Sequence, residues 1–419
     1  MIGTFLISLI ISLQILATKF IFLLNEGGAF SKFNLIVNLF IIILAIAFFF
    51  FRPKMKKVQE ILPKNWFLLG FFAILILITI SASFYINIGK TALDWDAVAL
   101  FEARAKYLSA GMKISEMMKL TEFDQLSNKP YYLLYPPHTT LVHYFWGKVG
   151  LNYPVSVYYA LVLLFLGISV FSASYQKLGV VGGLFLTLIT ISNKDIFVLS
   201  TLEYANLPYT LSIVFGVFLI ALFLYKRDYW ILLFGTFLIG TSQWIRWLEP
   251  IWLITLVSFA ISYFAVKNVS RRRKLLVVLL ITAFFFLEYL YWGNFSKNIA
   301  GSPGLVKINT LYIVKPILGI ITGNLSQMFT FLARNWGLYL IIYLTCMIVG
   351  IMNFRMLLRN VDLLFIFMFI FLTLCFYIFG IYFMSFQKQS WEVLSGSLLR
   401  SSTFLVPISG YLLLRFAKK

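Results

Sequence analysis

Two aspartates that flank a tryptophan are the residues of this chain best suited to chemistry. Asp94 and Asp96 stand on either side of Trp95, directly after a long apolar stretch. Two carboxylates this close repel each other unless a bound cation or a proton transfer makes use of them. Asp96 could instead cap the following helix, and Thr91 with Asp94 could form a capping box. Their place at the edge of an apolar stretch favours a functional role.

The aspartates precede a segment with the spacing of an amphipathic helix. Apolar side chains of residues 97–110 share one face, and Glu102 can pair with Lys106 one turn later. Gly111 is a suitable terminator, because glycine accepts the backbone conformation that ends many helices. The sequence therefore predicts a helix that lies in the membrane interface, with the two carboxylates at the point where the chain leaves the apolar layer.

A second, aromatic-rich segment follows in the same loop. Pro137 suits the first turn of a helix, and the aromatic residues around it are typical of helices at a membrane–water interface. His138 and His143 do not share a helical face at their spacing. We therefore expect them to be interfacial or hydrogen-bonded histidines rather than a pair of metal ligands.

The elements that must position these residues are helices that cross a membrane. Hydrophobic residues make up 61% of the chain and charged residues 12%, and the mean hydropathy is +0.91. Soluble domains are about half apolar and a quarter charged. The apolar runs are long enough to cross a bilayer and do not alternate as barrel strands do, which indicates helices. About twelve spans are predicted, in an all-α bundle: 3–24, 33–51, 66–88, 153–175, 179–192, 207–225, 229–245, 250–266, 275–292, 336–353, 362–384 and 398–415.

Basic residues predict the orientation of these spans. Placing the Lys- and Arg-rich segment 52–64 in the cytoplasm puts four further basic clusters on the same side, as the positive-inside rule requires. These clusters are residues 226–227, 271–274, 355–359 and 415–419. Most acidic residues then fall outside, where the longest loops are 89–152 and 293–335. The prediction is a multi-pass plasma-membrane protein with both termini cytoplasmic and its chemistry on the extracytoplasmic face.

The strong positive charge does not indicate nucleic-acid binding. The net charge of +20 follows from membrane topology and from attraction to anionic membrane lipids.

Cys346 and Cys375 both lie within apolar runs, so no disulfide framework is implied. Residues 3–24 are too long for the core of a signal peptide and are interpreted as a retained span.

The order of these motifs resembles the membrane-embedded C-superfamily of glycosyltransferases. An acidic motif at 94–96 follows an early span, and an interfacial helix and Tyr-Pro-Pro at 135–137 come next. The chain looks most like the group of protein O-mannosyltransferases and lipid A aminoarabinose transferases, to which bacterial lipopolysaccharide-core transferases are related. Segment 202–208 resembles the acidic-Leu-Pro element of that group. Segment 391–400, with Pro407 beyond it, resembles the late loop whose arginine approaches the donor.

The chain departs from that family in two places. Two spans precede the acidic motif where the family usually has one, so residues 1–64 look like an N-terminal membrane hairpin with a basic cytoplasmic link. Residues 65–419 then form the transferase-like domain. Position 206 is Asn206 where many relatives have an aspartate. Either Glu203 supplies the second acidic site instead, or this site is less acidic here than in those relatives.

The resemblance implies an inverting glycosyltransferase that moves a sugar from a polyprenyl-phosphate donor to an acceptor glycan, lipid or protein. Asp94 or Asp96 would act as the general base toward the acceptor hydroxyl. Arg246 and Arg400, both predicted at outer ends of spans, would bind the donor phosphate. Arg246 could equally form an i,i+3 pair with Glu249.

Further roles follow from the same resemblance. Trp95, Tyr135 and His138 would line the pocket for the acceptor and donor. A divalent cation, Mg²⁺ or Mn²⁺, could bridge Asp94 and Asp96 to the phosphate, because both ions prefer oxygen ligands. Nothing in the sequence demands that ion.

Other functions remain open. A transporter or flippase of lipid-linked saccharides would need charges deep in the membrane, where only Lys19 and Glu288 lie, and no internal repeat supports it. A polymerase or ligase of lipid-linked glycans would use a long outer loop such as 293–335, whose stretch 310–333 is amphipathic. A non-catalytic scaffold would need no role for the acidic motif.

Overall fold

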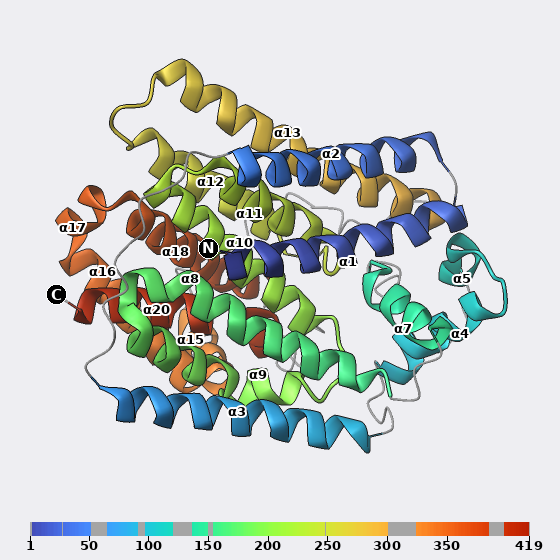
Figure 1. Ribbon diagram of the computed structural model, residues 1–419, viewed down its shortest axis with the longest axis horizontal. Helices are drawn as coiled ribbons and strands as arrows, with labels where there is room; N and C mark the ends of the chain where they lie inside the picture. The colour runs from blue at the N-terminus through green and yellow to red at the C-terminus, as the bar shows by residue number, and fades with distance from the viewer. Residues whose placement is uncertain are drawn as a thin grey trace.

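A computed structural model describes the protein at residues 2–26, 28–51, 65–90, 97–119, 136–149, 154–247, 249–300, 324–384 and 398–418. The described residues form helices joined by turns, with no strand among them (Figure 1). The first half contains α1 (Ile2–Glu26), α2 (Ala29–Phe51), α3 (Trp66–Ile88), the π-helix η1 (Ala97–Glu102), α4 (Ala103–Ser109), α5 (Ile114–Lys119), α7 (His138–Lys148), α8 (Ser156–Ile191) and α9 (Lys194–Leu199). The second half contains α10 (Asn206–Lys226), α11 (Tyr229–Thr241), the 3-10 turn η3 (Ser242–Trp244), α12 (Ile251–Phe264), α13 (Arg271–Ala300), α15 (Asn324–Trp336), α16 (Leu338–Met352), α17 (Phe354–Arg359), α18 (Val361–Met384) and α20 (Leu405–Ala417).

Seven of the described helices are long and apolar enough to cross a membrane. They are α1, α2, α3, α8, α10, most of α13 and most of α18, and the bent pair α15–α16 would make an eighth. The described part of the chain therefore has the helices of a multi-pass membrane protein, as the sequence predicts. Twelve spans are not confirmed, because α11, α12 and α20 have 13, 14 and 13 residues and are too short to cross about 30 Å of hydrocarbon unaided.

Helix α8 covers the fourth and fifth predicted spans because it folds back on itself at Gly179. The backbone there has φ 80° and ψ 172°, a conformation that only glycine adopts readily. A Cβ on Gly167 would lie 3.2 Å from Ile191 Cγ2, so the segments before and after Gly179 pack side by side. The two halves thus form an antiparallel helical hairpin.

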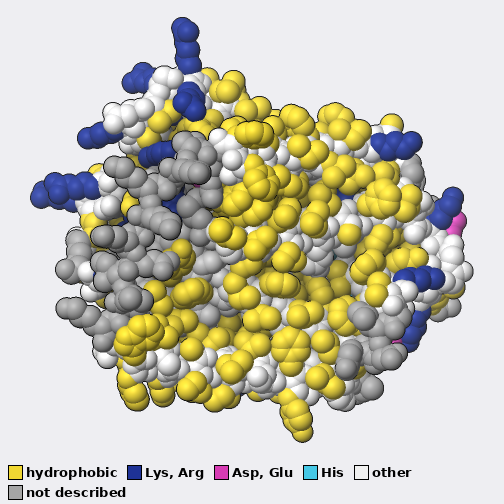
Figure 2. All heavy atoms as spheres, viewed as in Figure 1, with side chains coloured by type: hydrophobic (Ala, Val, Ile, Leu, Met, Phe, Trp, Pro, Cys, Tyr) yellow, Lys and Arg dark blue, Asp and Glu magenta, His cyan; other side chains and the backbone are white. Residues whose placement is uncertain are grey.

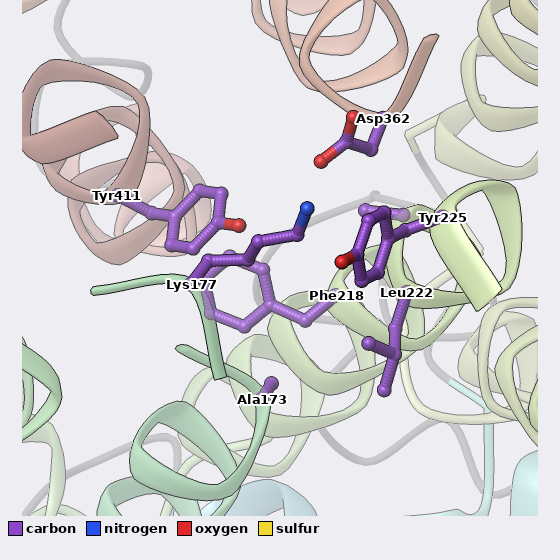
Figure 3. A pocket seen from close by; sticks show the side chains of 8 residues that line it. Ala173, Lys177, Phe218, Leu222, Tyr225, Asp362 and Tyr411 are labelled. Atoms are coloured by element: carbon purple, nitrogen blue, oxygen red, sulfur yellow. The ribbon is translucent and has the colours of Figure 1, made fainter. Parts of the chain in front are cut away.

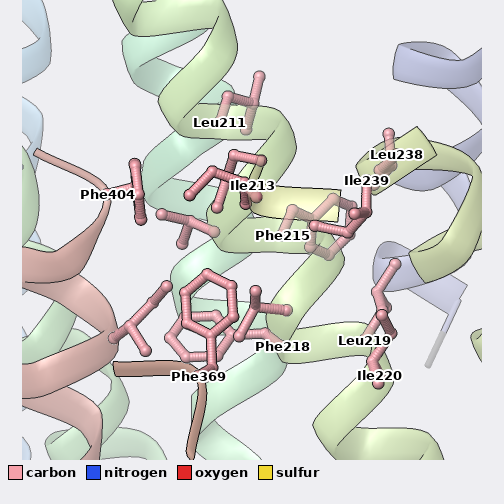
Figure 4. Packing of buried hydrophobic residues seen from close by; sticks show 14 of the residues in the cluster. Leu211, Ile213, Phe215, Phe218, Leu219, Ile220, Leu238, Ile239, Phe369 and Phe404 are labelled. Carbon is pink, nitrogen blue, oxygen red and sulfur yellow. The ribbon is translucent and has the colours of Figure 1, made fainter. Parts of the chain in front are cut away.

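Helix α10 is the centre of the bundle, and its membrane-length window is fully buried. Its side chains pack against α11, α18 and the residues that precede α20 (Figure 4). Helices α10 and α11 approach closely because Gly216 and Gly235 face each other: a Cβ on either would lie 3.1 Å from the other's carbonyl oxygen. By contrast, only 11% of the corresponding window of α3 is buried, and large apolar residues such as Phe67 and Leu77 are exposed there.

The charged residues gather at the ends of the bundle, and the surface between them is apolar (Figure 2). At one end, which we call the basic end, Lys177 lies close enough to Lys226 and Arg415 for their positive charges to repel one another. At the same end, the Arg273 guanidinium lies 5.1 Å from the ring centre of Tyr229. Helix α17, which carries another basic cluster, leads directly into α18 there. The opposite end, which we call the site end, carries η1, α4, α5 and α7 (Figure 1).

Candidate functional site

The acidic motif leads into a buried π-helix at the site end. Asp94, Trp95 and Asp96 lie outside the described residues, as does Tyr135. Ala97, which follows the motif in sequence, is 1% exposed and begins η1, which packs against α7 and continues as α4.

The helix expected over residues 97–110 is present as η1 and α4. Glu102 Oε1 lies 2.8 Å from Lys106 Nζ, as the i,i+4 spacing predicts. Gly111 follows with φ 91°, so the predicted glycine terminator is also confirmed. The helix is wider than expected over its first turn, because η1 has the π-helical pattern that is frequent at functional sites.

Helix α7 is present where the sequence predicts one. Pro137 is its N-cap rather than part of its first turn, and the helix begins at His138. His138 Nδ1 lies 3.2 Å from Thr18 Oγ1 on α1, and His143 Nε2 lies 3.1 Å from Tyr159 Oη on α8. Both histidines are therefore buried, hydrogen-bonded residues. Burial lowers the pKa of His138 to about 4 and that of His143 to about 3, so both rings are neutral near pH 7. The described residues contain no cluster of three or more potential metal ligands.

Glu203 lies in the short connection between α9 and α10 and is only 2% exposed. The connection is held by α3, because Asn87 Nδ2 donates to the Ser200 carbonyl at 2.9 Å and Lys90 donates to the Thr201 carbonyl. Glu203 also interacts electrostatically with Tyr159, the same tyrosine that contacts His143 on α7. The second acidic residue of the prediction is therefore close to the helix that packs on η1.

Arg400 approaches this connection from the C-terminal part of the chain. Its guanidinium carbon lies 5.2 Å from the ring centre of Tyr204, the residue next to Glu203. Two hydrogen bonds secure the turn that carries Arg400: Tyr377 Oη donates to the Ser401 carbonyl at 3.1 Å, and Trp336 Nε1 donates to Ser402 Oγ at 3.0 Å. Arg400 therefore lies next to segment 202–208, a contact that the sequence did not predict.

Arg246 has a different environment. Its Nη2 lies 2.8 Å from Glu249 Oε1, and both side chains are more than nine-tenths buried. The i,i+3 ion pair that the sequence left open is therefore formed, and it compensates the charge that was expected to bind a phosphate. The guanidinium carbon also lies 5.8 Å from the ring centre of Tyr209 on α10.

The two arginines converge on the first turns of α10. Arg400 contacts Tyr204 just before this helix, and Arg246 contacts Tyr209 within its second turn. The start of α10 is joined to the Arg400 turn by a 2.9 Å hydrogen bond between Thr210 Oγ1 and Thr403 Oγ1. A helix N-terminus carries unpaired backbone N–H groups and a partial positive charge, so this region favours an anionic group.

A polar cluster inside the bundle was not predicted as a unit. Lys19 Nζ lies 2.8 and 2.7 Å from the two carboxylate oxygens of Glu288, and it also donates to Asn34 Oδ1 and Asn38 Oδ1. Two further side chains donate to Glu288: Trp244 Nε1 to Oε2 at 3.0 Å and Asn38 Nδ2 to Oε1 at 2.6 Å. The available signal was the i,i+4 spacing of two asparagines inside the span 33–51.

The chain was also compared with known proteins. No family model, no curated protein and no solved structure matches it.

Proposed function

We propose that the protein is an inverting glycosyltransferase that takes a sugar from a polyprenyl-phosphate donor at the extracytoplasmic face of the plasma membrane. The observation that carries the proposal is that Arg400 lies over the ring of Tyr204, the neighbour of the buried Glu203, just before α10. A lipid-linked phosphate needs a cationic site next to apolar helices. Here Arg400 brings a guanidinium group to the N-terminus of the buried helix α10, whose partial charge is positive.

The proposed reaction forms one bond and breaks another at the anomeric carbon. The acceptor oxygen attacks that carbon while its proton passes to Asp94 or Asp96 as the general base. The bond between the anomeric carbon and the phosphate oxygen breaks, and the polyprenyl phosphate leaves as an anion. Arg400 and the N–H groups that open α10 stabilise that anion. Arg246, already paired with Glu249, orients the α10 end of the site.

The remaining parts of the site serve binding in this proposal. Trp95, Tyr135 and His138 line the sugar and acceptor pocket, with His138 held against α1 by Thr18. If a Mg²⁺ or Mn²⁺ ion takes part, Asp94 and Asp96 are the residues that hold it, and it adds positive charge beside the donor phosphate. The basic end faces the cytoplasm, with both termini on that side.

The test is an assay of purified protein with labelled polyprenyl-phosphate sugars. We expect one donor to be consumed, and Asp94→Asn or Asp96→Asn to abolish transfer without loss of the folded protein. Arg400→Gln should lower kcat/KM by about a hundredfold, as is typical when one group that stabilises a developing anion is removed. Arg334→Gln is the matched control, because Arg334 is an exposed arginine on α15.

Full activity of both aspartate variants would disprove the assignment of the base. Equal activity of the Arg400 and Arg334 variants would disprove the proposal that Arg400 binds the donor phosphate.

A polymerase or ligase of lipid-linked glycans is the second candidate. The amphipathic helix α15 favours it, because α15 meets α16 at an angle of 110° and is thus suited to lie along the membrane surface. Consumption of lipid-linked oligosaccharides, with no use of lipid-linked monosaccharides, would favour this function. A transporter or flippase draws less support, because Lys19 and Glu288 pair with each other.

A further inference from the structure

A partly open hollow lies at the basic end, far in sequence and position from the proposed transferase site. It contains about 270 Å³ of empty space, including the part open to solvent, and lies between α8, α10, α18 and α20 (Figure 3). Lys177 projects into it between Tyr225 and Tyr411, with its ammonium group directed toward Asp362 (Figure 3). The turn that carries Lys177 is secured by Lys418, whose Nζ donates to the Lys177 carbonyl at 2.8 Å.

The positive charge at this hollow exceeds the negative charge. Lys177 interacts electrostatically with Asp362, Arg415 and Lys226, and Arg227 also interacts with Asp362. Asp362 is the only carboxylate among these five groups. Its contact with Arg415 is loose, because the nitrogen and oxygen are 4.0 Å apart, beyond hydrogen-bonding distance.

Two buried guanidinium donors also lack acceptors within the described part of the chain. Arg415 Nε and Arg227 Nη1 are buried close to Asp362, beside the hollow rather than in its lining, and donate no hydrogen bond to a described residue. The Lys177 ammonium likewise donates no hydrogen bond to a described residue and lies 3.0 Å from the ring centre of Tyr225. Cations near helix C-termini are stabilised by the negative end of the helix dipole. That stabilisation gives a buried N–H group no hydrogen-bond acceptor, and a buried donor without an acceptor costs folding free energy. Oxygen atoms of an anionic ligand would supply them.

The apolar half of the hollow indicates which anion fits. Ala173, Phe218 and Leu222 form one wall, while the charged and phenolic groups lie on the other side (Figure 3). A free phosphate ion would leave that apolar wall in contact with water. A phospholipid would cover it with its glycerol and upper acyl chain while its phosphate meets the cations.

We propose that this hollow binds the headgroup of an anionic phospholipid. The phosphate accepts a hydrogen bond from Lys177, and Arg415, Lys226 and Arg227 beside the hollow add to the attraction. Asp362 compensates part of this positive charge in the lipid-free protein and weakens binding by its own negative charge. The site is independent of the transferase proposal, because it is at the opposite end of the bundle.

The experiment measures lipid binding to the purified full-length protein in neutral detergent. Phosphatidylglycerol and phosphatidylcholine with the same acyl chains are compared, and inorganic phosphate and glycerol phosphate serve as chain-free probes. We expect preferential binding of phosphatidylglycerol. Lys177→Gln and Arg415→Gln should each weaken it about fivefold, the effect of one cation near an anionic lipid.

Matched controls separate this site from general attraction to the basic end. Lys267→Gln and Arg355→Gln remove the same charges from exposed positions outside the hollow and should leave binding unchanged. Asp362→Asn should strengthen binding, which a variant that merely damages the fold would not do. Equal weakening by the control variants, equal binding of phosphatidylcholine, or binding of the chain-free phosphates alone would each overturn the proposal.

Discussion

Arg246 and Arg400 have the same predicted role, binding of the donor phosphate, but different surroundings in the structure. Arg246 and Arg400 were both expected at the outer ends of spans. Arg246 forms a buried ion pair with Glu249, whereas Arg400 stacks on Tyr204 beside Glu203. Removing one partner of a buried pair leaves an uncompensated charge, so Arg246 is expected to serve stability as well as binding. Arg400 is the better candidate for the donor phosphate.

The two histidines of the chain predict a pH dependence of stability. Their pKa values are lowered by burial to about 4 for His138 and about 3 for His143, below the ordinary value near 6.5. The unfolded chain therefore binds more protons than the folded protein below about pH 6.5, and folding stability must fall as the pH drops through that value toward 4. Each histidine contributes on the order of 3 kcal/mol to this loss. The measurement is thermal unfolding across this pH range.

The double variant His138→Asn/His143→Gln is the control, because the chain has only 2 histidines. Its stability should depend less on pH over the same range. An unchanged slope would mean that the carboxylates, rather than these histidines, control acid unfolding.

At the scale of elements, α1 joins parts of the bundle that are distant in sequence. Thr18 contacts His138 on α7, and the adjacent Lys19 forms the ion pair with Glu288 on α13. Helix α2 adds Asn34 and Asn38 to the same cluster. The N-terminal hairpin thus packs against both the site end and the C-terminal half.

The Lys19–Glu288 pair predicts strongly non-additive variants. Lys19→Met alone leaves a buried carboxylate without its cation and should cost about 3–5 kcal/mol of unfolding free energy. Glu288→Gln alone should leave the ammonium similarly uncompensated. The double variant should lose clearly less than the sum of the two losses. The measurement is reversible unfolding of the purified protein in detergent, and additive losses would show that the two groups are not coupled.

At the scale of the whole molecule, the position of the basic end predicts the topology. In a background with Cys346 and Cys375 replaced by alanine, Lys106→Cys at the site end should react with a membrane-impermeant maleimide on intact cells. Lys267→Cys at the basic end should react only after permeabilisation. Both lysines are exposed, so burial does not decide the outcome. The reverse pattern would place the proposed site in the cytoplasm and exclude the proposed donor geometry.

Part of the site was predictable because it depends on local sequence. The helix over 97–110, its Glu102–Lys106 pair and its glycine terminator follow from i,i+4 spacing and from the backbone freedom of Gly111. The start of α7 follows from Pro137. The choice between an ion pair and a phosphate site at Arg246 was not predictable, because both require the same local sequence.

The sequence by itself determined that this is a helical membrane protein and which stretches are apolar, because bilayer thickness and backbone hydrogen bonding act on each segment separately. Only the tertiary structure decided that α8 folds into a hairpin at Gly179, that Lys19 pairs with Glu288, and that Arg400 meets the start of α10. These contacts join residues that are distant in sequence, so they depend on how the helices pack rather than on any local pattern.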